Sequence, residues 1–246
     1  MYTYDQQFYK YINRGALDSA REVVPLLLGL LPGVGAVLDV GCGVGAWLSV
    51  WKDAGVRVTG LDGDYVDRQE LLIDAGSFEA VDLAVEFSLR RRFDLAQSLE
   101  VAEHLPESGG RALVVSLCKH ADVVVFSAAA PGQGGENHIN EQPYQYWQNL
   151  FSAQGYRMYD AVRPPLMNKP GVMPWYRYNT FLYVRENVLP ELHARLKEQA
   201  VAIGRPPVDV SPRWYQLRKL LIRLLPVWSM TWLAKLKKHL FPLLER

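Results

Sequence analysis

Short apolar segments that end in polar or glycine residues alternate along this chain with longer segments of helical apolar periodicity. The first pattern is typical of buried strands and the second of amphipathic helices. The strands that we predict lie at 36–40, 56–62, 78–83, 93–99, 122–127, 156–162 and 179–184. The helices that we predict lie at 1–31, 46–54, 65–75, 108–120 and 143–154. This alternation predicts an α/β fold, with a mostly parallel sheet and helices on both faces.

The first predicted helix contains Pro25, which has no backbone N–H to donate to the preceding turn. We therefore expect a kink or a restart at this residue. Asp18 or Ser19 is suitably placed to cap the segment that follows.

Length and composition indicate a globular protein. A chain of 246 residues has room for one α/β domain and an appendage. Hydrophobic residues make up 49% and charged residues 22% of the chain, which excludes disorder as its general state. Cys42 and Cys118 form neither a disulfide framework nor a Cys-x-x-Cys pair, which favours the cytoplasm. We expect no signal peptide and no membrane-spanning segment.

Residues 211–246 differ from the rest in charge, with eight of the 27 basic residues and one of the 26 acidic ones. Leu217, Leu221 and Leu224 share a helical face from which Arg218 and Lys219 point away. A basic segment rich in Leu and Trp is typical of peripheral contact with a membrane surface. Packing on the body or on a second subunit of a homodimer is the alternative. The acidic remainder argues against nucleic acid as a partner.

The segment Asp39-Val-Gly-Cys-Gly-Val-Gly45 joins the first predicted strand to the helix after it. Glycines there let the backbone approach a ligand closely, and the helix N-terminus presents unpaired N–H groups. Gly41 to Ala46 also satisfy the dinucleotide fingerprint, with Asp62 near the position of its ribose-binding acid. A nicotinamide dehydrogenase is therefore one hypothesis.

Asp39 argues against that hypothesis, because its carboxylate would repel a pyrophosphate and attract a cofactor with an amino cation and a sulfonium. With this acid, the segment resembles the first motif of class I S-adenosylmethionine-dependent methyltransferases. The resemblance covers roughly residues 35–185. It implies a Rossmann-like, seven-stranded, mostly parallel sheet, with the glycine loop around the methionine half of S-adenosyl-L-methionine.

Later segments resemble further motifs of this family in the same order. Gly60-Leu-Asp62 resembles the acid that holds the ribose, with Asp64 as a second candidate. Val81-Asp82-Leu83 resembles the adenine segment, although Asp82 as a helix cap is the alternative. Residues 93–104 resemble the motif that faces methionine and substrate. The cofactor-binding residues implied in this way are Asp39, Gly41, Cys42, Gly43, Gly45, Asp62, Gly63, Asp82, Leu83, Ser98, Leu99 and Glu100.

The polar loop at 132–142 follows an apolar strand, at the sheet edge where ligands of open α/β sheets bind. Methyl transfer needs an aligned acceptor and, for a hydroxyl, a base. We assign His138 as base or acceptor ligand. Glu141 orients a histidine or binds a polar acceptor, and His104 is a further catalytic candidate that otherwise orders the loop. No ligand spacing is diagnostic, so we expect no metal.

Residues 137–147 and 175–179 resemble a subgroup of these methyltransferases that often lies among genes for glycan assembly or natural-product tailoring. This chain has Pro174-Trp175 where that subgroup often has two tryptophans, so acceptor contacts differ there. The resemblance implies a small-molecule or glycan acceptor with hydroxyl groups, and hence O-methylation.

An N-methyltransferase and a non-catalytic cofactor-binding scaffold stay open as alternatives. We divide the chain into an N-terminal helical cap at 1–35, a catalytic domain at 36–185 and a helical extension at 186–246.

Overall fold

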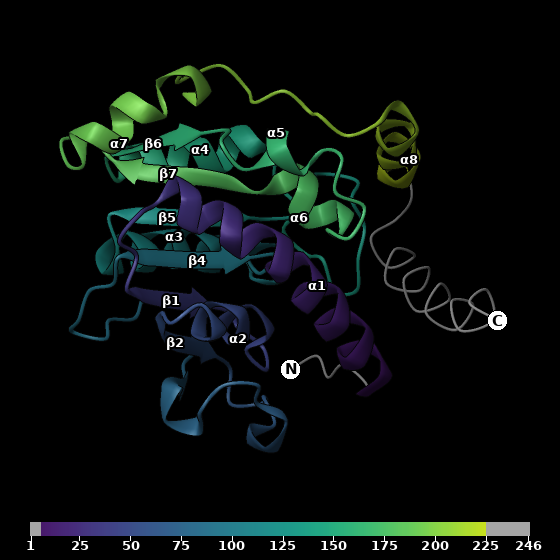
Figure 1. The fold of residues 1–246 in the computed structure, drawn as a ribbon. Coiled ribbons are helices and arrows are strands. Elements are labelled where there is room, and N and C mark those ends of the chain that lie inside the picture. Colours follow the sequence, from purple (N-terminus) through teal and green to yellow (C-terminus); the bar gives the residue numbers. More distant parts are fainter. Residues whose placement is uncertain (1–5, 225–246) are drawn as a thin grey trace.

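The computed structural model describes the backbone of residues 6–224 and the side chains of residues 13–224. One seven-stranded sheet, in the order β3-β2-β1-β4-β5-β7-β6, runs through it (Figure 1). The strands are β1 (Ala36–Val40), β2 (Arg57–Asp62), β3 (Phe78–Ala80), β4 (Leu95–Leu99), β5 (Val123–Ser127), β6 (Tyr156–Tyr159) and β7 (Phe181–Arg185). β7 pairs antiparallel with β5 and β6, and the other neighbours pair parallel. The predicted Rossmann-like, mostly parallel α/β fold is confirmed.

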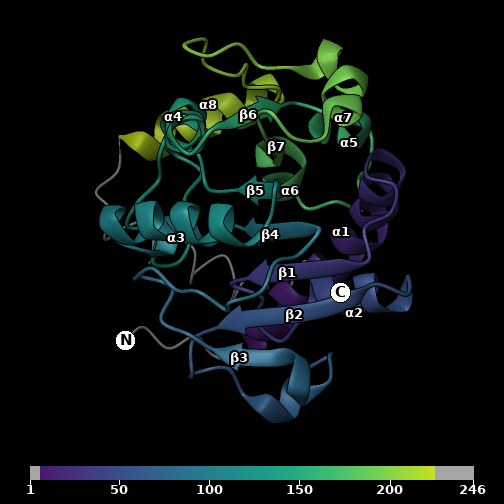
Figure 2. The ribbon, with the colours of Figure 1, turned by 90° about the vertical axis from the view of Figure 1, so that its left-hand side faces the viewer.

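Helices cover both faces of the sheet. They are α1 (Gln6–Leu30), α2 (Ala46–Asp53), α3 (Glu107–His120), α4 (Tyr144–Ala153), α5 (Arg163–Leu166), α6 (Pro174–Asn179), α7 (Pro190–Arg195) and α8 (Arg213–Arg223). α1 and α2 lie on one face, and α3 and α4 lie on the other (Figure 2). Two apolar clusters result, because successive strand residues point to opposite faces. Val37 belongs to the first cluster, whereas Leu38 and Val40 belong to the second.

The strand order reverses at the carboxyl end of β1, which is where open α/β sheets bind ligands in a crevice. The chain moves from β1 outward to β2 and β3, then returns to place β4 on the other side of β1. Where the order reverses in this way, the connections after neighbouring strands diverge and leave room for a ligand. The segments after β1, β2 and β4 therefore meet at one end of the sheet.

The helix predicted at 65–75 is wrong. The structure has two short 3₁₀ turns there, η1 (Arg68–Glu70) and η2 (Ala75–Ser77). The Asp67 side chain accepts from the Gln69 N–H at 2.9 Å and holds the first turn. The Leu72 N–H donates to the Val44 carbonyl of the glycine loop at 2.8 Å. A tertiary contact of the backbone thus replaces the hydrogen bond that a helix would have formed. Local periodicity does not reveal such a contact.

A restart of the helix at Pro25, one of the two expected outcomes, is also wrong, because α1 continues through this residue to Leu30. The lost backbone bond is offset by burial of neighbouring apolar residues, among them Val24 and Leu27. Ser19 is no cap. Its hydroxyl lies within the helix, donates to the Gly15 carbonyl at 2.6 Å and accepts from the Met173 N–H at 3.0 Å.

Every predicted strand except β1 has different bounds. The largest differences are that β3 ends at Ala80, β6 ends at Tyr159, and β4 and β7 begin two residues late, at Leu95 and Phe181. The short helices α5 and α6 were not predicted, because fewer than two turns give no readable periodicity. The predicted amphipathic segment from Trp228 onward lies outside the described residues. Among residues 6–224, no helix combines the length and apolar character needed to cross a bilayer. The three-part division of the chain stays a prediction.

Candidate functional site

The glycine loop after β1 has a backbone that side chains would not tolerate. Gly41, Gly43 and Gly45 have φ of 83°, 54° and 85°, in the left-handed region. A Cβ at Gly41 would also stand 2.3 Å from a methyl carbon of Val101. Gly45 precedes α2 without a side-chain cap, and Cys42 is buried beneath the loop. The loop therefore presents the start of α2 to a ligand, as predicted from its sequence.

Asp39 lies buried under this loop, in register with Gln97 of β4. Burial, with a smaller effect from the negative charge of nearby Asp62, raises the pKa of Asp39 to about 7 against the opposing hydrogen bond of the Gln97 amide. Because burial disfavours the ionised form of this carboxyl group, a ligand with positive charge would stabilise that form. A preference for a cationic ligand is also what the sequence predicts for Asp39.

Asp62 ties the end of β2 to the glycine loop. Its carboxylate accepts from the N–H groups of Gly43 and Gly63, both at 2.7 Å, and from the Tyr65 hydroxyl at 2.5 Å. Burial raises the pKa of Asp62, although these three donors oppose the shift. The alternative acid, Asp64, is instead 90% exposed and lies 3.5 Å from Arg68. The buried acid of this pair is thus Asp62, which the sequence ranked first.

The predicted adenine segment continues from β3. The Val81 N–H donates to the Asp62 carbonyl oxygen at 2.8 Å, which places the segment beside the ribose acid. Asp82 is exposed and accepts from the Ala84 N–H at 2.9 Å, so it caps a turn and no helix. Leu83 is buried in the cluster under α3. These residues form the rim of the crevice at its β3 side.

At the end of β4, Ser98 and Leu99 are buried and the chain turns sharply at Glu100. Glu100 has a φ of 58°, which is uncommon for a residue with a side chain. Its carboxylate accepts from Gln133 Nε2 at 2.6 Å and from Asn179 Nδ2 at 3.2 Å. Burial raises the pKa of Glu100. Strained backbone of this kind is common at functional sites.

Gln133 and Asn179 were not among the predicted site residues. They belong to the loop after β5 and to α6, and Asn179 Nδ2 also donates to Gln133 Oε1 at 2.7 Å. Both lie in segments that the sequence placed near the acceptor, but no spacing distinguished them there. Tyr176 of α6 was missed as well. It is buried, and its ring lies 5.0 Å from that of Trp47. Burial raises its pKa, and the negative charges of Glu100 and Asp39 add smaller effects in the same direction.

The predicted catalytic residues His138, Glu141 and His104 do come together. His138 Nδ1 lies 2.8 Å from Glu141 Oε1, and both side chains are at most 10% exposed. Glu141 also accepts from the N–H groups of Gly132 and Gly134 at 2.7 Å. The rings of His104 and His138 meet edge to face at 4.9 Å. Burial, with a smaller effect from the nearby His138, lowers the pKa of His104 to about 3.

The helix α8 lies over the same loop. Arg218 donates to the Gln133 carbonyl at 2.9 Å, and the Lys219 ammonium lies 2.5 Å from Asp209. A Cβ at Gly132, where φ is 81°, would stand 2.2 Å from the Lys219 carbonyl oxygen. The described part of the basic tail therefore packs on the body and holds the loop that carries Glu141.

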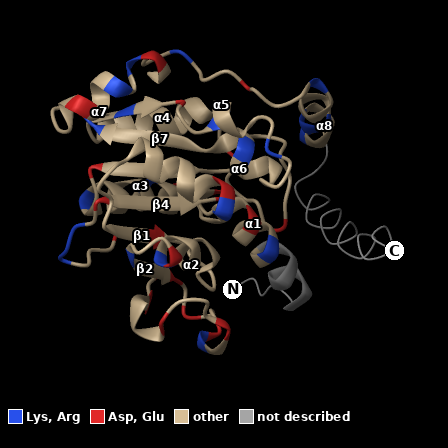
Figure 3. Ribbon diagram, in the orientation of Figure 1, with Lys and Arg blue, Asp and Glu red and all other residues tan. Residues whose placement is uncertain are grey.

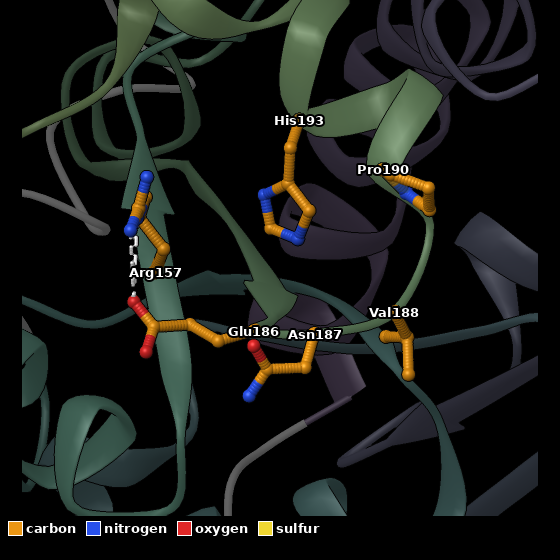
Figure 4. A pocket seen from close by; sticks show the side chains of 6 residues that line it. All are labelled: Arg157, Glu186, Asn187, Val188, Pro190 and His193. Atoms are coloured by element: carbon orange, nitrogen blue, oxygen red, sulfur yellow. Dashed lines mark hydrogen bonds and ion pairs between the residues drawn. The ribbon is translucent and has the colours of Figure 1, made fainter.

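A cavity of about 360 Å³ lies at the opposite end of the sheet (Figure 4). It is lined by Arg157, Glu186, Asn187, Val188, Pro190 and His193. Arg157 and Glu186 form an ion pair there at 3.1 Å. β7 runs antiparallel to β5, so the residues after it lie away from the glycine loop (Figure 1). None of the predicted site residues belongs to this cavity.

Comparison with known proteins gives a family and a fold. The sequence profile of a family described as methyltransferase domain matches residues 11–162. No match was found among curated proteins. The sugar N-methyltransferase KedS8 from Streptoalloteichus is 17% identical, with a TM-score of 0.57 over 75% of this chain and 96% of that one. CalS10 from Micromonospora echinaspora, an amino pentose methyltransferase, is 19% identical, with a TM-score of 0.53 over 75% and 99%.

Proposed function

We propose that this chain, which belongs to the methyltransferase-domain family and uses S-adenosyl-L-methionine, methylates a hydroxyl group of a sugar, glycan or similar polar small molecule. The single observation that carries the acceptor chemistry is the His138–Glu141 pair at 2.8 Å. The Glu141 carboxylate orients His138, which lies in a nearly buried loop beside the crevice. A histidine held in this way is suited to receive the proton of an acceptor hydroxyl.

The residues present fit the cofactor. Asp39 and Asp62 are both buried at the glycine loop, and the cofactor has a cationic amino group and a cationic sulfonium. A Cβ at Gly43 would meet no atom within 4 Å, so the loop has space on that side. The Tyr65 hydroxyl now bonded to Asp62 holds the place that we assign to a ribose hydroxyl. Tyr65 is 53% exposed and has room to turn away.

When bound, the cofactor supplies a methyl group on a positively charged sulfur, which leaves as a neutral thioether. The chain's own residues align the acceptor oxygen in line with that bond and hold the proton that the oxygen loses. Glu141 accepts at His138 Nδ1, so Nδ1 carries a proton and Nε2 has the lone pair that takes the acceptor's proton. Tyr176 and Trp47 present aromatic rings near Asp39, where π-faces favour a sulfonium.

An amino sugar is the second candidate acceptor. KedS8 and CalS10, which share the fold, are described as a sugar N-methyltransferase and an amino pentose methyltransferase. An amine must also lose a proton around the transfer, so the same histidine serves both reactions. O-methylation stays the first proposal because of the hydroxylated acceptors that the sequence resemblance implies.

A mass-spectrometric screen tests this function. The protein is incubated with S-adenosylmethionine and sugar nucleotides that carry either free hydroxyls or one amino group. We expect S-adenosylhomocysteine to accumulate, together with a sugar that gains one methyl group. Calorimetry with S-adenosylhomocysteine and with NAD is the companion measurement. Binding of NAD alone would contradict the cofactor assignment, and cofactor binding without any methylated product would favour the scaffold alternative.

Cofactor affinity is expected to depend on pH through Asp39. Its pKa of about 7 lies above its ordinary value of 3.8, and the cofactor's cation prefers the ionised form. S-adenosylhomocysteine should therefore bind more weakly as pH falls below 7, by up to about 10-fold per unit. Calorimetry between pH 5.5 and about 8.5, on wild type and Asp39→Asn, measures this, and the pH range spans about one and a half units on each side of that pKa.

The unliganded protein should show the opposite trend in stability. Since the folded state holds the Asp39 proton more tightly, that contribution is fully present below about pH 4 and is lost as pH rises through 7. The buried neighbours Asp62, Glu100 and Glu103 shift in the same direction, so the difference between wild type and Asp39→Asn isolates this residue. A pH-independent difference in both affinity and stability would contradict the assignment.

The outward face of α8 supports peripheral contact with a membrane surface, which stays a prediction, as does a location in the cytoplasm. Its exposed apolar residues are Trp214, Leu217, Leu220, Leu221 and Leu224. Basic residues of α8 lie beside them (Figure 3). We expect the double variant Leu217→Gln, Leu221→Gln to float less with vesicles of anionic lipid than wild type does. Both side chains are more than half exposed, so the loop contacts of α8 should persist.

Wild type that does not float contradicts the membrane prediction. A dimer in sedimentation that the same double variant dissociates would assign the face to a second subunit instead.

A further inference from the structure

Glu103 is a buried acid that has no use in the mechanism above. Its side chain is fully buried, and among the described residues neither carboxylate oxygen makes a hydrogen bond of ordinary geometry, although the backbone N–H groups of Glu103 and Ala129 partly stabilise its charge. Burying a polar group without a partner costs several kcal/mol, of order 2–7, and a charge costs more. Groups of this kind in folded proteins call for a specific explanation, and an ion that binds there is one of the common ones.

The backbone explains how this acid comes to face the polar loop. Glu103 belongs to the short turn η3 (Ala102–His104), directly after Glu100. Its carbonyl oxygen accepts from the N–H groups of Ile139 and Asn140, at 2.9 and 3.0 Å. Asn140 Nδ2 also donates to the Ala102 carbonyl at 3.2 Å. These bonds fasten the loop to η3 and bring His138 beside Glu103 and His104.

Two imidazoles complete the group with defined tautomers. His104 Nδ1 lies 3.3 Å from the Asn137 carbonyl oxygen, and His138 Nδ1 lies 2.8 Å from Glu141. Both partners accept hydrogen bonds, so each Nδ1 carries the proton and each lone pair lies on Nε2. This is the arrangement of histidines that bind metals, whose second nitrogen donates to a carbonyl or a carboxylate.

We propose that Glu103, His104 and His138 bind a divalent transition-metal ion. One ligand atom from each residue lies within 4.8 Å of the other two. Three ligands at about 2.0–2.2 Å from one ion stand roughly 3–3.6 Å apart, so side-chain movements that shorten each distance by up to about 1–2 Å close the group. Two imidazoles and one carboxylate suit zinc, iron, cobalt or manganese, and they suit magnesium or calcium less well.

Three protein ligands leave coordination positions open, as in metal sites that act on a substrate. That the open positions face the acceptor rests on the proposed function; the binding of the ion does not. An ion bound at His138 Nε2 would use the lone pair that the proposed base needs, so the two roles of His138 are alternatives. Glu100 is not a ligand here, because its oxygens are engaged by Gln133 and Asn179. The sequence favoured a site without metal because no ligand spacing was diagnostic, and His138 is remote from Glu103 and His104 along the chain. In the folded chain the three side chains lie next to one another.

Cobalt is a suitable probe, because its visible absorption reports the ligands. Protein freed of metals with a chelator and dialysed is titrated with Co²⁺ alone. We expect absorption bands that aqueous Co²⁺ lacks, and saturation at one equivalent. Glu103→Gln, which keeps the shape and removes the charge, should weaken Co²⁺ binding at least about 10-fold. His138→Asn should do the same, and Glu141→Gln should weaken binding less, because its amide oxygen still accepts from Nδ1 but no longer carries the charge that makes the imidazole a stronger ligand.

His193→Asn is the matched control, because this histidine contacts Tyr159 and the Arg185 carbonyl at the opposite end of the sheet. It should bind Co²⁺ as wild type does. Binding of S-adenosylhomocysteine by each variant shows that it is folded. Aqueous-type bands in wild type, or equal Co²⁺ affinity in Glu103→Gln, His138→Asn and wild type, would overturn the site. No acceptor enters this measurement, so a failed search for methylated sugars leaves its result intact.

Discussion

Turnover is expected to fall about 10²–10⁴-fold when His138 is replaced by alanine, which is the usual contribution of one positioned proton acceptor. The affinity for S-adenosylhomocysteine should stay at the wild-type value. His138 lies in the loop after β5, whereas the predicted cofactor residues Asp39 and Asp62 follow β1 and β2. The measurement is steady-state kinetics on a methylated acceptor from the screen, together with calorimetry for the cofactor product.

His193→Ala is the kinetic control, because it removes an imidazole from the far cavity and should leave turnover unchanged. Glu141→Gln should lower turnover less than His138→Ala does, since the amide oxygen still accepts from Nδ1. A His138→Ala variant that turns over as wild type does would refute the assignment. A variant that loses cofactor affinity to the same degree would indicate a structural role.

The same kinetics separate the two roles of His138. A proton acceptor alone gives turnover that does not respond to chelator treatment. A ligand of an ion gives turnover that chelator treatment abolishes and that Co²⁺ or Mn²⁺ restores in wild type but not in Glu103→Gln. Both roles predict a loss in His138→Ala, so the chelator experiment decides between them.

The second large effect is expected at Gly41. Alanine there must adopt a φ of 83° and would bring its Cβ to 2.3 Å from Val101. The left-handed backbone costs about 1–3 kcal/mol and the overpacking a similar amount. The melting temperature should therefore fall by roughly 5–15 °C. Cofactor binding should weaken too, because the loop has to move away from β4. Thermal unfolding and calorimetry measure the two effects.

Gly43→Ala is the matched comparison, because a Cβ there meets no atom within 4 Å although φ is 54°. Its melting temperature should fall less, through backbone strain of about 1–2 kcal/mol. Its cofactor affinity should fall strongly, because the new methyl group enters the space assigned to the ligand. Equal melting temperatures for the two variants would contradict the packing argument at Gly41.

Elements with a strong local signal were predicted well. The five residues of β1 are each buried or half-buried, and helix α4 begins and ends within one residue of its prediction. The helix at 65–75 failed because Leu72 bonds to the glycine loop instead of to its own turn. The restart at Pro25 failed because burial of α1 against the sheet outweighs one missing hydrogen bond. In both cases tertiary contacts overrode a local preference.

The cofactor side of the site was readable for a similar reason. A loop between a strand and a helix must present its residues at the carboxyl edge of the sheet, so Asp39, Asp62 and the glycines follow from topology. The hydrogen-bond partners of Glu100 could not be predicted from the sequence. Gln133 and Asn179 come from separate segments, and only the packing of α6 and α8 around the loop brings them together.

The sequence by itself determined the fold class, the glycine loop and the acids that distinguish this cofactor from a dinucleotide. These properties depend on periodicity and on short motifs, in which neighbours along the chain are neighbours in space. The tertiary structure alone decided that Glu103, His104 and His138 share one buried group, and that α8 closes over the acceptor loop. Such groups join residues far apart in sequence, whose distances are set by how the sheet and its connections pack.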